Sequence, residues 1–117
     1  MAFELPDLPY PHDALAASGM SKETLEFHHD IHHKAYVDNG NKAIAGTPFE
    51  SLSLEEICKK AFADKSAPIF NNAGQHYNHL HFWQWMKPNG GGDKIPGKLK
   101  AAIDSDLGGL EKMKTDF

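Results

Sequence analysis

"EFHHDIHHKAYVDN", residues 26–39, holds four of the eight histidines of the chain within six positions. The segment lies inside a longer stretch, residues 22–45, in which apolar residues recur at helical spacing. This spacing predicts a long helix that begins after Ser21, a favourable N-cap residue, and ends before Gly46 and Pro48. Residues four apart on such a helix share a face, so the histidines form rows along it.

A second long helix is predicted over residues 66–85, with Ser66 as its cap and Pro68 tolerated in its first turn. "SLEE", residues 53–56, is a capping box that opens a short helix through about Phe62. No segment alternates apolar and polar residues as a half-buried strand does. The sequence therefore predicts an all-α fold built on a helical hairpin of two long antiparallel helices.

Prolines and glycines bracket the predicted hairpin. Three prolines in residues 1–20 exclude an early helix, so we expect an extended arm there. "KPNGGGDKIPG", residues 87–97, is typical of a linker between domains. We therefore expect a helical hairpin domain over residues 1–87, and a linker with the start of a second domain over residues 88–117.

The C-terminal stretch predicts two further helices, over residues 99–103 and 110–117. The second of these has an apolar stripe at i, i+3 and i+7 that stops at a bulky phenylalanine without a capping residue. We therefore expect the chain to be a fragment of a longer protein, cut within a helix. A natural short chain whose last helix packs on the hairpin is the alternative.

Composition excludes several classes of partner. The net charge of −4, with twelve lysines and no arginine, argues against nucleic acid binding. No apolar run approaches the roughly 18 residues of a membrane span, so no membrane partner is expected. A single cysteine, Cys58, allows no intrachain disulfide, and the first residues lack a secretory pattern. These features predict a cytoplasmic protein.

Both predicted long helices carry rings and polar groups at matching positions. The rows have i, i+4, i+8 spacing and consist of His28, His32 and Tyr36 on the first helix, and Gln75, His79 and Trp83 on the second. If the helices pack as a hairpin, the two rows can face each other and hold a metal ion between them. His12, His33 and His81 have no matching partner in this pattern, so we expect them to be solvated or singly hydrogen-bonded.

Two specific metal motifs fail on inspection. "HDIHH", residues 29–33, resembles the HExxH of metalloproteases, but Asp30 is shorter than the required glutamate. Glu26 and His29 form an ExxH as in di-iron bundles, but the second long helix has no glutamate to complete such a centre. The residues alone therefore leave three hypotheses: the metal centre of an enzyme, a non-enzymatic histidine-rich metal-binding helical module, and a structural hairpin with incidental histidines.

Three stretches, in order along the chain, resemble iron/manganese superoxide dismutases. "FELPDLPYPHDAL", residues 3–15, resembles the family's N-terminal arm, and residues 26–39 resemble its first long helix. "FNNAGQHYNHLHFWQWMKPNGGG", residues 70–92, resembles its second long helix and linker. The resemblance implies disproportionation of superoxide to oxygen and hydrogen peroxide by one redox-cycling iron, or alternatively manganese, per subunit. It also implies a homodimer with the active-site funnel at the subunit interface.

The resemblance assigns metal ligation to His28 and His79, and an aromatic wall of the metal pocket to Trp83. The family completes its site with an aspartate and a histidine from a C-terminal α/β domain, around a "DVWEHAY"-like segment. That segment is absent here. We therefore expect residues 88–117 to contain only the first helices of that α/β domain. We also expect the longer parent protein to be the enzyme, and the isolated chain to be inactive.

The resemblance also names the residues that act beside the metal. It places Tyr36 and His32 along the substrate funnel, and Gln75 at the hydrogen bond to the metal-bound solvent in iron-type members. Gln75 favours iron, whereas Phe82 stands where iron types often have tyrosine and is more typical of manganese types. The sequence thus favours iron and leaves activity with both metals open.

Overall fold

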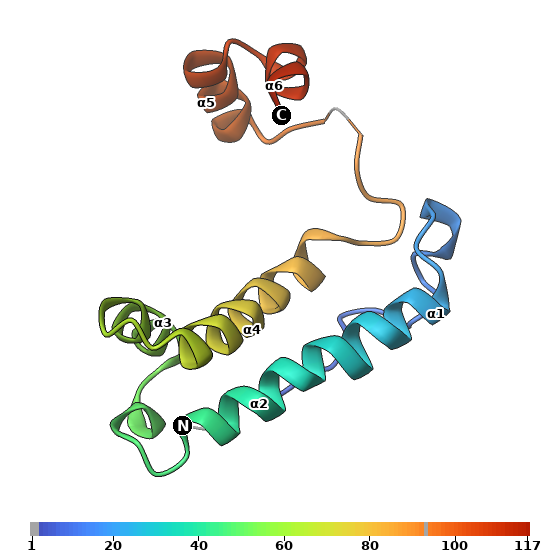
Figure 1. Ribbon diagram of the computed structural model, residues 1–117. Helices are drawn as coiled ribbons and strands as arrows, with labels where there is room; N and C mark the ends of the chain where they lie inside the picture. The colour runs from blue at the N-terminus through green and yellow to red at the C-terminus, as the bar shows by residue number, and fades with distance from the viewer. Residues whose placement is uncertain (1–2, 93) are drawn as a thin grey trace.

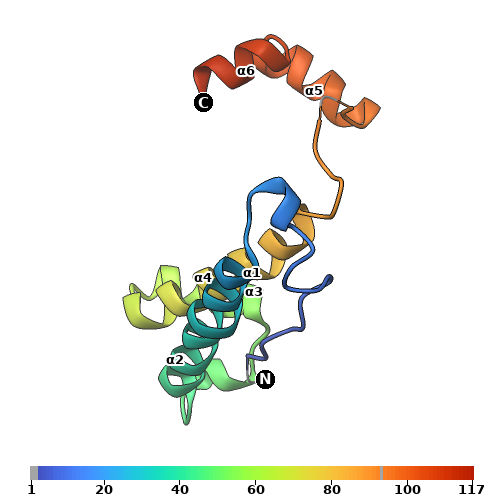
Figure 2. The same cartoon turned by 90° about the vertical axis from the view of Figure 1, so that its right-hand side faces the viewer.

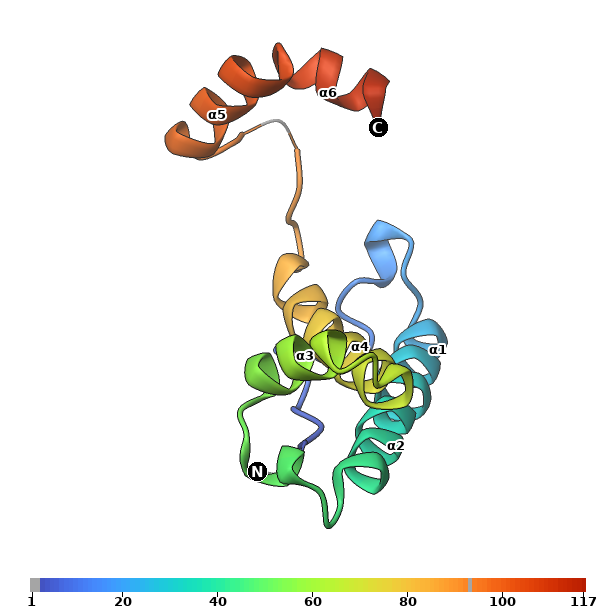
Figure 3. The same cartoon turned by 60° about the vertical axis from the view of Figure 1, so that its left-hand side comes forward.

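The computed structural model describes residues 3–92 and 94–117, and this part of the chain is helical with no β-strand (Figure 1). The first long helix consists of three consecutive segments, α1 (Lys22–Leu25), a π-helical segment (Glu26–His33) and α2 (Lys34–Ile44). Helix α4 (Ala67–Trp85) runs beside it in the opposite direction (Figures 1 and 3). The predicted all-α fold with an antiparallel helical hairpin is confirmed.

Shorter helices accompany the hairpin. They are 3₁₀ turns at Ala16–Ser18 and Pro48–Ser51, helix α3 (Leu54–Ala63), helix α5 (Gly97–Leu107) and helix α6 (Leu110–Asp116). Helix α3 packs on α4, whereas α5 and α6 pack on each other and stand apart from the hairpin (Figures 1 and 2). Helix α5 is longer than predicted and ends where Gly108 adopts a φ of 77°. None of the described helices is long and apolar enough to cross a membrane.

Two of the three predicted N-caps are present. The Ser21 hydroxyl accepts a hydrogen bond from the Thr24 N–H at 3.1 Å. Ser53 and Glu56 form the complete capping box that opens α3. The prediction for Ser66 is wrong, because its side chain makes no capping hydrogen bond. Its N–H instead donates to the Ala61 carbonyl at 2.9 Å, which ties the end of α3 tightly to the start of α4.

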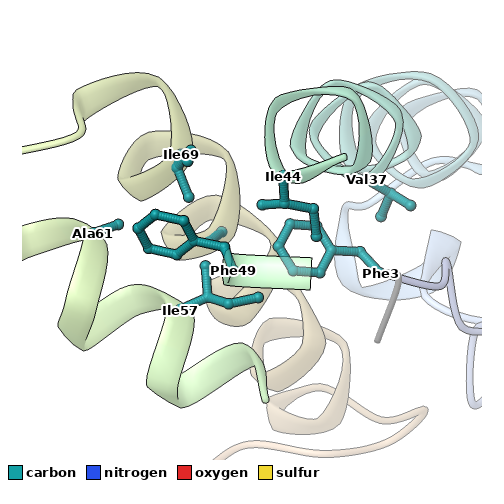
Figure 4. Packing of buried hydrophobic residues seen from close by; sticks show 8 residues of the cluster. Phe3, Val37, Ile44, Phe49, Ile57, Ala61 and Ile69 are labelled. Carbon is teal, nitrogen blue, oxygen red and sulfur yellow. The ribbon is translucent and has the colours of Figure 1, made fainter. Parts of the chain in front are cut away.

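Apolar side chains are buried in two clusters at opposite ends of the hairpin. The cluster at the turn end comprises Phe3, Val37, Ile44, Phe49, Ile57, Ala61, Ile69 and Ala73 (Figure 4). The cluster at the other end comprises Tyr10, Leu15, Leu25 and Trp83. Three buried histidines, His29, His33 and His76, lie at positions between those of the two clusters along the helices. The hairpin core is thus apolar at both ends and polar in the middle.

The N-terminal arm is extended, as predicted, and runs along the hairpin before its one 3₁₀ turn (Figure 3). The Phe3 N–H donates to the Asn41 side-chain oxygen at 2.7 Å, and the Asn41 amide donates back to the Phe3 carbonyl at 2.9 Å. The Phe3 ring then lies directly over Gly40, where a Cβ atom would overlap it. Gly40 therefore provides the close approach that lets the arm reach the core.

Replacing Gly40 with alanine tests this contact, and Gly74→Ala is a matched control on α4. Both changes gain helix propensity, but a Cβ at Gly74 has no atom within 4 Å. We expect Gly40→Ala to lower the free energy of unfolding by about 1–2 kcal/mol through overpacking. We expect Gly74→Ala to raise it by about 0.5–1 kcal/mol. Urea titration measures both, and equal effects of the two variants would contradict the Phe3 contact.

Candidate metal centre

Two histidines from opposite helices of the hairpin meet at their ring nitrogens. His28 comes from the π segment and His79 from α4, and their Nε2 atoms lie 3.0 Å apart. The ring planes are nearly perpendicular, at 89°, with centroids 5.0 Å apart. The predicted proximity of these two imidazoles is confirmed.

The hydrogen bond on the far side of His79 fixes which nitrogen faces His28. His79 Nδ1 is 2.6 Å from the Gln75 carbonyl oxygen, and a carbonyl can only accept, so Nδ1 carries the proton. The Nε2 lone pair of His79 therefore points toward His28. A backbone carbonyl on the outer nitrogen is the usual support of a metal-binding histidine.

The spacing of the two nitrogens suits a shared metal ion. Metal–nitrogen bonds of about 2.1 Å that meet at right angles place the two nitrogens about 3 Å apart. Imidazole nitrogen is a good ligand for iron and related transition metals. The spacing of the pair therefore fits two neighbouring ligands of one metal ion.

Aromatic rings surround the pair. The Trp83 ring lies 4.9 Å from that of His28, and the Tyr36 ring lies 5.4 Å from that of His79, measured between centroids. Trp83 is almost fully buried. A pocket of about 420 Å³ opens beside the pair, lined by His28, Asn78, His79, Phe82 and Trp85. The histidine pair is thus walled by aromatic rings on one side and reachable by small molecules on the other.

Two residues of the predicted facing rows, His32 and Gln75, do not extend their side chains into the contact between His28 and His79. The side chains of His32 and Gln75 are both exposed. Within residues 3–92 and 94–117, Gln75 takes part in the site only through its carbonyl, which holds His79. The two rows therefore meet along their edges, through His28, Tyr36, His79 and Trp83.

The expectation that His33 is solvated or singly hydrogen-bonded is wrong. The side chain is fully buried, and its Nδ1 accepts a hydrogen bond from the Trp83 indole N–H at 3.0 Å. Its Nε2 must then carry the proton in the neutral ring, and donates to His76 Nδ1 at 2.8 Å. His33 thus connects Trp83 to His76 across the hairpin.

The sequence reasoning also missed His76, although the sequence contains a signal for it. His76 follows Ile69 and Ala73 by seven and three residues, so it continues the apolar stripe that faces the core of the hairpin. A histidine on such a stripe is expected to be buried and to need a partner. His33 is harder to find, because its partners lie on a different helix.

The π segment explains why both His28 and His33 approach α4. Their separation of five residues matches the i to i+5 hydrogen-bond spacing of a π-helix, which turns less per residue than an α-helix. His79 accordingly contacts both, with its ring stacked 5.0 Å from that of His33. The α-helical rows assumed from the sequence did not include this widening.

His12 is half-buried and has one hydrogen-bond partner, Asp30, which agrees with the expectation for this residue. Its Nε2 lies 3.1 Å from each carboxylate oxygen of Asp30, and Asp30 in turn contacts His29. The hydrogen bond with His29 lowers the pKa of the Asp30 carboxyl. His81 is exposed, and its ring packs edge-on against that of Tyr77.

The imidazoles of His33 and His76 are held neutral. Burial, followed by repulsion from His76 and His79, lowers the pKa of His33 to about 3. Burial and then His79 lower the pKa of His76 to about 4. Burial, with smaller contributions from His79, His32 and His29, also lowers the pKa of His28. Neutral imidazoles keep the lone pairs that a metal ion needs.

The family model described as "Iron/manganese superoxide dismutases, alpha-hairpin domain" matches residues 2–87. The chain belongs to the iron/manganese superoxide dismutase family. The resemblance of the arm, the two long helices and the linker to this family is therefore confirmed.

Individual members of the family match along the whole chain. It is 62% identical over 117 residues to "Superoxide dismutase [Mn]" of Rhizobium meliloti, and covers 58% of that protein. It is 59% identical over 120 residues to "Superoxide dismutase [Fe]" of Rhodobacter capsulatus, and covers 60% of it. It is 55% identical to "Superoxide dismutase [Fe]" of Coxiella burnetii over 117 residues, which are 58% of that protein. The chain thus spans well under two thirds of these superoxide dismutases.

The buried histidines predict a pH dependence of stability in the metal-free protein. Unfolded histidines titrate near pH 6.5, whereas folded His33 and His76 do so near 3 and 4. Between pH 6.5 and about pH 4, these two histidines take up protons only in the unfolded chain. The free energy of unfolding is therefore highest above pH 6.5 and falls toward pH 4. Each histidine contributes up to about 2 kcal/mol of this loss between pH 7.5 and 5.

Urea titration at pH 7.5 and at pH 5 measures this loss. We expect His76→Gln to reduce it, because glutamine can accept the bond from His33 but takes up no proton when unfolded. His81→Gln changes an exposed histidine and is expected to leave the loss unchanged. A loss of the same size in His76→Gln and in the unmodified protein would contradict the prediction.

Proposed function

We propose that the whole protein, to which this chain contributes the helical hairpin, is a superoxide dismutase. Two superoxide anions and two protons would yield one molecule of oxygen and one of hydrogen peroxide. One iron ion per subunit, or alternatively one manganese ion, would supply the electron transfer by alternating between the 3+ and 2+ states. The observation that carries the proposal is the 3.0 Å approach of His28 Nε2 to His79 Nε2 in a chain of this family.

His28 and His79 would provide two of the metal ligands, and Trp83 a wall of the metal pocket. The support for this assignment is the bond from His79 Nδ1–H to the Gln75 carbonyl, which directs Nε2 inward, and the burial of Trp83 against His28. Two imidazoles alone bind a metal ion weakly, so further ligands are needed. We propose that an aspartate and a histidine from the part of the family that this chain does not span complete the set.

Three residues would act on the substrate and its protons. Tyr36, with its ring against His79, would line the approach to the site, and the exposed His32, one turn earlier, would continue that path toward the surface. Gln75 would offer its side-chain amide as a hydrogen-bond donor and so adjust the reduction potential. In the described chain this amide is exposed, and we propose that it is covered in the whole protein.

Iron is the proposed metal, with manganese as the alternative. Gln75 favours iron and Phe82 favours manganese, and the relatives named above include proteins of both types. Activity with either metal is consistent with this mixture. Three cases are possible: activity with iron alone, with manganese alone, or with either metal. They are distinguished by growing the source cells with one metal at a time and measuring the activity per bound metal ion.

We further propose the organisation of the whole protein. Residues 1–87 would form the hairpin domain, and residues 88–117 the linker and the first helices of a second, α/β domain. A homodimer would place the substrate funnel at the subunit interface. The single cysteine supports a cytoplasmic location. Light scattering of the whole protein tests whether it is a homodimer, and fractionation of its source cells tests the cytoplasmic location.

Loss of a metal ligand tests the proposed function directly. We expect His28→Ala and His79→Ala each to lower metal content and dismutase activity of the whole protein by more than about 100-fold, since even outer partners of ligands cost 10–100-fold. His81→Ala, at an exposed position two residues after His79, is the matched control and should retain both. Full activity in either ligand variant would refute the proposed centre.

The role of Gln75 is separable from metal binding. We expect Gln75→Glu, which keeps the shape but exchanges a donor for an acceptor, to retain the metal and lower activity about tenfold or more. Asn78→Asp introduces the same charge at an exposed position that lines the pocket beside the histidine pair, and is the control. The reduction potential should move more in Gln75→Glu than in Asn78→Asp. If the protein is instead a non-enzymatic metal-binding module, the unmodified protein will bind metal but show no dismutase activity.

A further inference from the structure

A second cluster of metal-binding side chains lies where the N-terminal arm meets the π segment. His12 comes from the arm, and His29 and Asp30 follow His28 on the helix. Their ligand atoms all lie within 4.8 Å of one another. His28 turns toward His79 on α4, whereas the next residue, His29, turns toward the arm. The proposed dismutase centre thus uses none of these three side chains.

The hydrogen bonds of His29 define what its second nitrogen can do. His29 Nε2 lies 2.7 Å from the Pro6 carbonyl oxygen, which can only accept, so Nε2 carries a proton. A neutral His29 therefore presents the lone pair of Nδ1 on its other side. That nitrogen lies 2.5 Å from Asp30 Oδ1. A lone pair and a carboxylate oxygen repel each other at this distance unless a positive species joins them.

His12 approaches the same carboxylate from the arm. Its Nε2 lies 3.1 Å from both Asp30 oxygens, and its ring stands edge-on to that of His29 with centroids 6.1 Å apart. Two imidazole nitrogens thus converge on one carboxylate from two separate segments of the chain. His29 is buried and held by a backbone carbonyl, whereas His12 and Asp30 are partly exposed, so an ion can enter from solvent.

We propose that His12 Nε2, His29 Nδ1 and the Asp30 carboxylate bind a divalent cation such as Zn²⁺. Two nitrogens and one carboxylate are a common three-ligand set for zinc, with solvent in the fourth position. Calcium and magnesium are disfavoured because they require mostly oxygen ligands. The Pro6 carbonyl on the outer nitrogen of His29 provides the support typical of a liganding histidine.

Ligand spacing is compatible with this assignment. Bonds of about 2.1 Å in a tetrahedral site separate neighbouring ligand atoms by about 3.4 Å. The His29 and Asp30 ligand atoms lie 2.5 Å apart, and no two ligand atoms of the group are more than 4.8 Å apart. Changes in the side-chain torsions of His12 and Asp30, which are both partly exposed, would bring the three ligand atoms to the tetrahedral separation. The ion would also tie the arm to the helix, because His12 and Asp30 are 18 residues apart.

Zinc binding to a variant without the other histidine pair tests the proposal. In His28→Gln/His79→Gln protein, we expect isothermal titration calorimetry to detect one equivalent of Zn²⁺. Addition of His12→Gln or of Asp30→Asn should weaken this binding at least about tenfold, whereas addition of His81→Gln should not. Zn²⁺ should also raise the melting temperature of the background variant, and less so after His12→Gln.

The same titration of the unmodified protein gives an answer even if the double variant misfolds. In protein that keeps His28 and His79, His12→Gln should remove one equivalent of bound zinc and leave the zinc bound elsewhere unchanged. If neither protein binds zinc through His12, the cluster is an ion pair joined by a proton and the proposal is overturned. This experiment does not measure dismutase activity. Absence of zinc binding would therefore not refute the proposed dismutase function, and absence of dismutase activity would not refute the zinc site.

Discussion

Buried imidazoles are the constraint around which this hairpin is organised. A buried ring nitrogen without a partner costs several times what an ordinary hydrogen bond contributes, so each must be matched. Among the described residues, no buried side-chain nitrogen or oxygen lacks a hydrogen-bond partner. Trp83 donates to His33, which donates to His76, and this sequence of bonds fixes both the rotation and the register of the two long helices. Apolar packing at either end could tolerate small slips, whereas this polar layer cannot.

The polar layer also explains how the two proposed metal ligands can be positioned before a metal ion binds. His28 and His79 are held by the same helices whose register His33 and His76 determine. The aromatic ring of Trp83 contacts His28 on one side and bonds His33 on the other. The positions of the proposed ligands are therefore set by the protein core, which would reduce the ordering cost of metal binding.

Local signals in the sequence predicted the helices well. Periodicity, the cap at Ser21 and the capping box at Ser53 define elements whose hydrogen bonds lie within a few residues, so the sequence contains the needed information. The proximity of His28 and His79 followed from equal spacing on two antiparallel helices. The rotation of the histidines was less predictable, because the π segment changes the angle between successive side chains. The position of His12 could not be predicted, since an extended arm has no periodicity from which to infer its course.

The arm has a consequence for how the chain is made. Its first bonds are to Asn41, and the hydroxyl of Tyr10 donates to the Trp83 carbonyl, 73 residues later. During synthesis the residues of the arm emerge before the two long helices. Tyr10 nevertheless pairs with Trp83, which lies only two residues before the end of α4. The bond from Tyr10 to Trp83 must therefore wait until nearly the whole hairpin has left the ribosome, whereas Phe3 can bond Asn41 earlier. Part of the arm is thus synthesised before the two long helices but is among the last segments to reach its final place.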